Sequence, residues 1–233
     1  MKYRYDLHIH SALSPCAEEE MTPVTIVGQA ALSGLDFVAI ADHNAIGHVP
    51  LALRAGEEFG VRVVPAVEVQ TSEDIHLLCM FRTYGELEDF FSRIPVSERK
   101  NRADIFGEQL YFDEDDNVIG REERMLLDSA AISCDDVREL AFSLGGVAVP
   151  AHIDRDANSM LNVLGAVPAE YPTVELSSRA SEEELKKWSG ERLVIVDSDA
   201  HILEHMSDRG EIDLPEGSVD ALIDRLRRGG SDA

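Results

Sequence analysis

The sequence predicts an α/β fold in which a closed or nearly closed β/α barrel forms a single domain over residues 1–233. Three observations lead to this prediction. Short apolar runs alternate with amphipathic segments of helical spacing along most of the chain. The expected strands number close to seven, which favours closure of a parallel sheet. A length of 233 residues suits one well-buried domain and leaves little room for two.

The alternation of strand and helix is clearest up to about residue 80. Strands are expected at 5–10, 36–41, 61–69 and 75–81. One helix is expected to start at Pro23, after the cap Thr22, and to end at Gly34, and a second to run from Pro50 to Gly60. Proline favours the first turn of a helix and glycine its end. This rhythm predicts parallel strands covered by helices.

The segment 95–132 interrupts the rhythm, because it is polar and charged and contains the run DEDDN at 113–117. We expect an insertion, a long connection or a small lid there. The alternation then resumes, with helices starting at the cap Ser133 and Asp136, at the capping box Ser181 to Glu184 and at about 218. Further strands are expected at 146–151, about 172–177 and 192–197.

The charge balance is strongly acidic, with 21 Lys and Arg against 45 Asp and Glu and a formal net charge of -24. Such a surface repels polyanions, so we expect no extended nucleic-acid surface, although cations bound in a cleft can reverse the field locally. The three cysteines are widely spaced and indicate no disulfide framework. The chain shows no apolar leader and no run long enough to span a membrane, so a cytoplasmic location is expected.

Histidines and carboxylates gather at or just past the ends of the expected strands, and six of the eight histidines lie there. In a parallel barrel the active site is built at the C-terminal ends of the strands. A single such residue is more often a satisfied polar group or a turn former, but the pattern repeats six times. The residues concerned are His8 and His10, Asp42 and His43, Glu68, His76, His152, and Asp199 with His201.

The pair His8 and His10 points both imidazoles to the same side of a strand, so two ligands can hold one metal ion. Glu68 adds a carboxylate able to bridge two cations, and Asp199 completes a nitrogen and oxygen set typical of zinc, manganese or iron. Without cations, packed carboxylates and imidazoles would be costly to bury. Divalent ions also lower the pKa of bound water, which predicts hydrolysis of a phosphoester.

The motifs DLHIHS, ADHN, PAH and SDAH, with Glu68 and His76 between them, resemble those of the PHP (polymerase and histidinol phosphatase) family, in order, from residue 6 to 201. The resemblance implies a distorted (β/α)7, TIM-like barrel and two to three divalent ions (Zn, Mn or Fe) that hydrolyse phosphoesters. It further implies one metal held by His8, His10, Glu68 and Asp199, a second by Glu68, His76 and His152, and a third by His43 and His201. Asp42 is expected to be a weak ligand or to orient a neighbouring imidazole.

One position departs from the family pattern, since SALSPC follows the HxH pair where a further His or Asp ligand is common. Cys16 is the candidate for the third metal, and the alternative is a small buried apolar residue. Positive groups for a phosphate are expected at Arg155 and Arg179, because a guanidinium matches two phosphoryl oxygens. Either arginine is alternatively an ordinary surface ion-pair partner.

The expected substrate is a small phosphomonoester or nucleotide, with histidinol phosphate and a nucleoside bisphosphate as examples. A nuclease acting on the end of a short polynucleotide is the first alternative. An amidohydrolase-type metal hydrolase is the second, although none of the four lysines stands at an expected strand end. A non-catalytic PHP module is the third, and it would be marked by missing ligand positions.

Overall fold

The computed structural model describes residues 1–190, 192–206 and 210–230. The strands are β1 (Lys2–Ile9), β2 (Phe37–Ile40), β3 (Arg62–Val63), β4 (Ala66–Gln70), β5 (His76–Met80), β6 (Leu110–Phe112), β7 (Val118–Arg121), β8 (Val147–Pro150), β9 (Thr173–Ser177), β10 (Leu193–Asp197) and β11 (Gly210–Asp213). The helices are α1 (Pro23–Leu32), α2 (Val49–Phe59), α3 (Tyr84–Phe91), α4 (Ala103–Phe106), α5 (Cys134–Ser143), α6 (Met160–Leu164), α7 (Glu182–Trp188) and α8 (Val219–Arg228), with the 3₁₀ helix η1 (Leu203–His205). The predicted α/β class is confirmed.

The helix starts follow the local chemistry of the sequence. Thr22 caps α1 by accepting a hydrogen bond from the backbone of Thr25, and proline occupies the first turn. Ser181 and Glu184 form the predicted capping box of α7. The expected strand 61–69 is divided into β3 and β4, with Val64 and Pro65 between them. Pro65 has no N–H to donate to a strand ladder, which accounts for the break.

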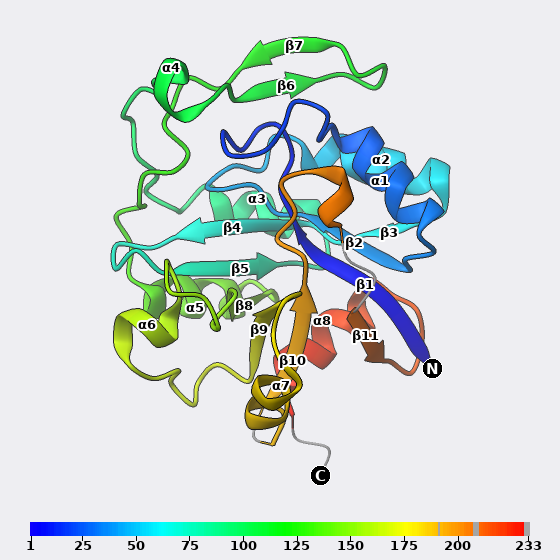
Figure 1. Ribbon diagram of the computed structural model, residues 1–233, viewed down its shortest axis with the longest axis vertical. Helices are drawn as coiled ribbons and strands as arrows, with labels where there is room; N and C mark the ends of the chain where they lie inside the picture. Colours follow the sequence, from blue (N-terminus) through cyan, green and yellow to red (C-terminus); the bar gives the residue numbers. More distant parts are fainter. Residues whose placement is uncertain (191, 207–209, 231–233) are drawn as a thin grey trace.

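The described strands form four sheets. Three of them, with the orders β11-β1-β2-β3, β10-β9 and β4-β5-β8, make up the body of the molecule, and the fourth is the pair β6-β7. Isolated bridges join Ile9 to Ala200 and His43 to Glu68, so the ends of neighbouring sheets meet. Within the described ranges the strand pairing does not run continuously around a ring, and a closed barrel is not seen. Figure 1 shows β1 and β10 running toward the centre of the molecule from different directions, with β4 and β5 lying across it beside them.

The expectation of parallel strands is correct for β1-β2, β2-β3 and β9-β10 and wrong for the sheet β4-β5-β8, which is antiparallel. Only residues 71–75 separate β4 from β5. A connection this short makes a hairpin, because a parallel pair needs a crossover of a dozen or more residues. The antiparallel pairing sets His76 opposite Gln70, so the start of β5 lies beside the end of β4.

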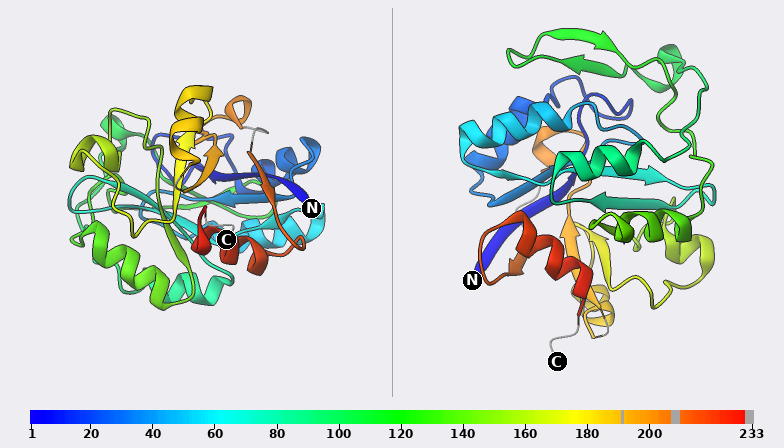
Figure 2. Two further views of the ribbon diagram at one scale, coloured as in Figure 1. Left: turned by 90° about the horizontal axis from the view of Figure 1, so that it is seen from below. Right: turned by 180° about the vertical axis from the view of Figure 1, so that it is seen from behind.

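Helices cover the outer faces of the sheets. Side chains of α1 and α2 pack with Val38 and Ile40 in one apolar cluster, and α3 and α5 pack with β5 in another. Seen from behind, α3, α5 and the red α8 lie over the strands (Figure 2). No helix in the described part of the chain has both the length and the apolar character needed to cross a bilayer.

The segment 95–132, expected to be an insertion, a long connection or a lid, contains the short helix α4 and the antiparallel hairpin β6-β7. These elements project from the body at the top of Figure 1. The inner strand is nevertheless attached, since the backbone N–H of Leu110 donates to the carbonyl of Ala12 at 2.9 Å. Leu110 and Phe112 pack with Ala12 in a small apolar cluster. The hairpin therefore rests on the loop that follows β1.

Candidate metal centre

The predicted ligand residues come together where β1, β2, β4, β8 and β10 end. His8 lies in β1 and His10 directly after it, and His43 follows β2. The bridge between His43 and Glu68, and the bond from the backbone N–H of Asn44 to the carbonyl of Glu68, tie the end of β2 to β4. The loop after β10 is held to β1 by the bond from the N–H of His10 to the carbonyl of Ala200. Distant segments thus form one site.

The placement of His76 corrects an expectation. The sequence pattern put His76 near the end of a strand, whereas it is the first residue of β5. Because β5 runs antiparallel to β4, this start lies at the same edge of the sheet as the end of β4. His76 therefore lies in the same cluster as Glu68, although β4 and β5 run in opposite directions.

Glu68 is the centre of the cluster and is fully buried. Five imidazole nitrogens surround its carboxylate. The distances are 3.2 Å to Nε2 of His8, 3.4 Å to Nε2 of His10, 2.7 Å to Nδ1 of His43, 2.9 Å to Nδ1 of His76 and 3.3 Å to Nε2 of His152. A carboxylate in this position can bridge two cations.

Asp199 completes one end of the cluster. Its Oδ1 lies 2.9 Å from Nε2 of His10 and 3.6 Å from Nε2 of His8, and those two nitrogens are 3.2 Å apart. This arrangement joins His8, His10, Glu68 and Asp199, the set that the motifs predicted for one metal. His201 stacks on His10, with ring centroids 4.4 Å apart, and His10, His43 and His201 form a further group of converging nitrogens.

Hydrogen bonding supports a fit between these residues and metal ions. Both oxygens of Glu68, Nδ1 of His43 and Nδ1 of His76 are buried and have no hydrogen-bond partner in the described part of the chain. Buried polar atoms are rarely left in this state, because each one loses its hydration without compensation. The unsatisfied atoms all point at one another. Divalent cations among them would satisfy every one, and nitrogen with carboxylate oxygen is a donor set for zinc, manganese or iron.

Two residues that the sequence did not single out hold His8 and His10 in the orientation needed for metal binding. Nδ1 of His8 lies 2.9 Å from the fully buried Glu175, and Nδ1 of His10 lies 3.1 Å from the hydroxyl of Ser14. When each Nδ1–H donates to its partner, both Nε2 lone pairs face the cluster. Glu175 lies inside β9, a strand whose residues are all buried. A carboxylate is costly to bury there unless a partner compensates its charge, and His8 is that partner.

Asp42 lies behind the cluster rather than in it. Its Oδ1 accepts hydrogen bonds from the backbone N–H of Ser11 at 2.8 Å and the hydroxyl of Ser14 at 2.7 Å, and its Oδ2 accepts one from the hydroxyl of Ser11 at 2.6 Å. Burial raises the pKa of Asp42 to about 6, although these hydrogen bonds act in the opposite direction. Asp42 is therefore connected to His10 through Ser14.

The mutual proximity of the charges shifts their titration. Burial alone would raise the pKa of Glu68, but the imidazoles of His76, His8 and His43 hold it well below its ordinary value. Burial would likewise lower the pKa of His8, but the carboxylates of Glu175, Glu68 and Asp199 raise it well above its usual range. Strongly perturbed groups gathered in one place are typical of functional sites.

The backbone is strained at two of the predicted ligands. His152 has φ 31° and Asp199 has φ 48°, a left-handed region that non-glycine residues seldom adopt. Both residues lie two positions past the end of a strand, β8 for His152 and β10 for Asp199. Left-handed conformations of this kind cost about 1–3 kcal/mol each and tend to occur at functional sites.

The remaining predicted residues lie around the rim. Cys16 is exposed as a residue, but its sulfur lies against the protein. Partial desolvation raises the pKa of this thiol, and the neighbouring His201 and His43 lower it by more, to about 7. Arg155 is half-exposed and forms an ion pair with Asp199, which places its guanidinium beside the cluster. Arg179 is exposed and follows the end of β9, and its backbone N–H donates to Ser177.

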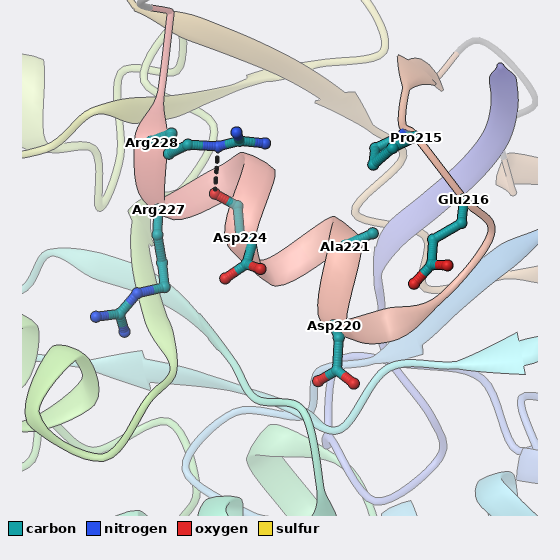
Figure 3. A pocket seen from close by; sticks show the side chains of 7 residues that line it. All are labelled: Pro215, Glu216, Asp220, Ala221, Asp224, Arg227 and Arg228. Carbon is teal, nitrogen blue, oxygen red and sulfur yellow. Dashed lines mark hydrogen bonds between the residues drawn. The ribbon is translucent and has the colours of Figure 1, made fainter.

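A surface hollow elsewhere on the protein does not include any of these residues. It has a volume of about 520 Å³ and is lined by α8 and the turn before it, including Glu216, Asp220 and Asp224 (Figure 3). Arg82 lies close by and forms ion pairs with Asp220 and Asp224. This hollow therefore does not overlap the buried cluster.

Comparisons with known proteins give local sequence matches to two enzymes that act on nucleic acids. No protein-family model matches the chain. It is 32% identical over 72 residues to a 5'-3' exoribonuclease of Haemophilus influenzae and 36% identical over 73 residues to a PolC-type DNA polymerase III of Oceanobacillus iheyensis. Each match covers 31% of this chain, but only 25% of the exoribonuclease and 5% of the polymerase.

Solved structures share the fold over nearly the whole chain. The lesion-specific endonuclease Q of Pyrococcus furiosus matches 97% of this chain and 56% of its own, with a TM-score of 0.67 and 19% identity. A Bifidobacterium adolescentis protein assigned as a metal-dependent phosphoesterase matches 84% of this chain and 87% of its own, with a TM-score of 0.55 and 20% identity. An amidohydrolase from Chromobacterium violaceum covers 92% of this chain with a TM-score of 0.58 and 18% identity.

One expectation is corrected by these structures. Endonuclease Q has been solved with a 27-mer duplex carrying an abasic lesion at its active site. The inference from net charge, that no extended nucleic-acid surface is present, is therefore wrong as an argument about this fold. Net charge averages over the whole surface, whereas contact with a polyanion depends on the field near the site, where bound cations dominate.

Proposed function

We propose a metal-dependent phosphoesterase function for this chain, whose fold and motif order are those of the PHP family. The observation that carries the proposal is the group of imidazoles around Glu68, whose oxygens have no hydrogen-bond partner among the described residues. All eight histidine and carboxylate ligands expected from the motifs are present, which counts against a non-catalytic module. The amidohydrolase alternative is less favoured because Glu68 occupies the central bridging place, where that class often uses a carboxylated lysine. Lys2 and Lys100 instead form exposed ion pairs.

Two to three divalent ions, zinc, manganese or iron, would be held by these residues. His8, His10, Glu68 and Asp199 would bind the first, and Glu68, His76 and His152 the second. His43 and His201 would bind the third, with Cys16 at its exposed side. Bound cations of this kind polarise a phosphoryl oxygen and lower the pKa of coordinated water.

The surrounding residues would orient the ligands and the substrate. Glu175 and Asp42 fix the imidazoles of His8 and His10, the latter through Ser14. The guanidinium of Arg155, which pairs with Asp199, would donate hydrogen bonds to a phosphate bound at the cluster. Arg179 is proposed as a second phosphate contact, because it follows the same end of β9.

The first candidate substrate is a small phosphomonoester or nucleotide. Its phosphate group would be bound by the metal ions and by Arg155, which lies beside Asp199. The second candidate is a nuclease, and the local match to an exoribonuclease and the fold shared with endonuclease Q favour it.

A substrate screen tests the proposal. The full chain is stripped with a chelator, loaded in turn with manganese, zinc and iron, and offered an aryl phosphate and mono- and bisphosphorylated nucleotides. A short 5'-phosphorylated oligonucleotide and a duplex with an abasic site are included. Hydrolysis that needs metal and is lost in His8→Ala, but kept in the exposed control His205→Ala, is expected. Preference for an oligonucleotide favours the nuclease, and inertness towards every ester with metal bound contradicts both candidates.

A further inference from the structure

His48 is a buried histidine that the ligand set does not include. It precedes α2 and is only 2% exposed. Its Nδ1 lies 2.7 Å from the hydroxyl oxygen of Ser11, and its Nε2 accepts a hydrogen bond from the backbone N–H of Phe112 at 3.2 Å. One ring therefore contacts both the loop after β1 and the hairpin β6-β7.

The hydrogen bonds fix the tautomer of this ring. Because the N–H of Phe112 donates to Nε2, that nitrogen has no hydrogen, and in a neutral imidazole the hydrogen is on Nδ1. Burial lowers the pKa of His48 to about 4, which keeps the ring neutral near pH 7. Nδ1–H consequently donates to Ser11, whose own hydroxyl is free to donate onward.

The chain of hydrogen bonds continues from Ser11 to the metal cluster. The hydroxyl of Ser11 donates to Asp42 at 2.6 Å, and Asp42 accepts the hydroxyl of Ser14 at 2.7 Å. Ser14 in turn accepts from Nδ1–H of His10 at 3.1 Å and from the backbone N–H of His43 at 3.2 Å. Each group has its donor and acceptor roles set by its neighbour, so His10 is held with Nε2 towards Glu68.

The hairpin holds His48 in place on its other side. The ring of Tyr111 meets that of His48 edge-on, with centroids 5.8 Å apart, and Phe112 lies at 6.0 Å. Gly47 packs so tightly on Tyr111 that a Cβ there would lie 2.5 Å from the tyrosine ring. Gly107, with φ +102°, leaves a Cβ only 2.2 Å from the carbonyl oxygen of Pro15, next to Cys16. The residues Tyr111 and Gly107 of the segment 95–132 therefore pack closely on the loops that follow β2 and β1.

We propose that His48 is a positioning residue that couples the hairpin β6-β7 to the metal centre through Ser11, Asp42 and Ser14, so that its loss weakens metal binding at His10 and His43. The inference rests on the proposed metal site but not on any substrate. It gives the hairpin a role as a support of the ligand set in addition to any contact with substrate.

The test measures metal binding by the full chain. Chelator-stripped protein is titrated with Co²⁺, and the dissociation constants and the visible absorption bands are recorded. The matched variants are His48→Leu, which removes both hydrogen bonds, His48→Asn, whose amide can replace Nδ1–H towards Ser11, and His48→Gln, whose amide reaches the Nε2 position. Ser11→Ala interrupts the chain while leaving the hairpin contact, and the exposed His205→Asn is the control.

We expect His48→Leu, His48→Gln and Ser11→Ala to weaken binding of one ion by roughly tenfold or more, as loss of a ligand-orienting partner typically does. The absorption bands of that ion should change, whereas the control His205→Asn should stay within about threefold of the unaltered chain. His48→Asn keeps the bond to Ser11 but loses the bond from Phe112, so its dissociation constant should lie between these two results. If His48→Leu does not fold, the proposal is tested by Ser11→Ala and by the comparison of His48→Asn with His48→Gln. Unchanged constants in folded Ser11→Ala, or rescue by Gln and not by Asn, would overturn the proposal. If the His48 and Ser11 variants change Co²⁺ binding as expected but the protein hydrolyses no ester, only the proposed function is contradicted.

Discussion

Replacing Glu68 with glutamine tests the central feature of the site. Glutamine has nearly the same shape but no charge, so Glu68→Gln removes the bridging carboxylate while leaving the surrounding volume filled. Glu68 is fully buried, and five imidazole nitrogens lie between 2.7 and 3.4 Å from its oxygens. Removing one partner of a buried charge pair costs roughly 3–5 kcal/mol. If an energy of the same size is lost between residue 68 and the bound cations, the metal affinity falls by about 10²- to 10⁴-fold.

The assay for Glu68→Gln is competition for metal between the stripped protein and a chromophoric chelator, with metal content measured by mass spectrometry after dialysis. Circular dichroism confirms that the variant is folded. The exposed Glu57→Gln is the matched control and should bind as the unaltered chain does. The reasoning is refuted if folded Glu68→Gln retains the same number of ions with affinities within about threefold of the unaltered chain.

Further predictions follow from neighbouring residues. Glu175→Gln removes the carboxylate charge that faces Nδ1 of His8 and should weaken binding of the first metal by about 10–100-fold in the same titration. Chelation should lower the melting temperature by about 5–10 °C relative to protein with metal at a hundred times its dissociation constant, measured by calorimetry. Arg155→Ala should raise KM for a phosphate ester roughly tenfold with little change in kcat, in steady-state assays. An unchanged KM would remove Arg155 from the substrate site. His48 has its pKa lowered from 6.5 to about 4, so the unfolded chain binds its proton first as the pH falls. The free energy of unfolding should therefore drop by about 2 kcal/mol from pH 7 to 5, and urea titrations of His48→Gln should lack this loss.

Most of the helices were predictable from the sequence because their ends depend on short-range chemistry. Thr22 with Pro23, Ser133, and Ser181 with Glu184 cap helices as expected. The antiparallel sheet β4-β5-β8 was not predicted, since a buried strand has the same apolar run in either direction. The five-residue connection 71–75 was the available signal, because a parallel pair cannot be joined by so few residues.

The cluster itself was largely predictable, and its supporting residues were not. Histidines and carboxylates at strand ends stand out against apolar runs, and the structure brings His8, His10, His43, His76, His152 and His201 together with Glu68 and Asp199. Glu175 carried a weaker signal, a single carboxylate inside an apolar strand. His48 carried none, because its role depends on Phe112, 64 positions away, and that contact exists only once the hairpin has packed.

The most direct measurement of the central claim is anomalous diffraction at the metal absorption edge from crystals of the full chain grown with manganese or zinc. The account predicts one peak among His8, His10, Glu68 and Asp199 and a second on the opposite side of Glu68, beside His76 and His152. A third is predicted beside His43, His201 and Cys16. Metal found only at surface carboxylates, with Glu68 still surrounded by imidazoles and no ion between them, would contradict the account.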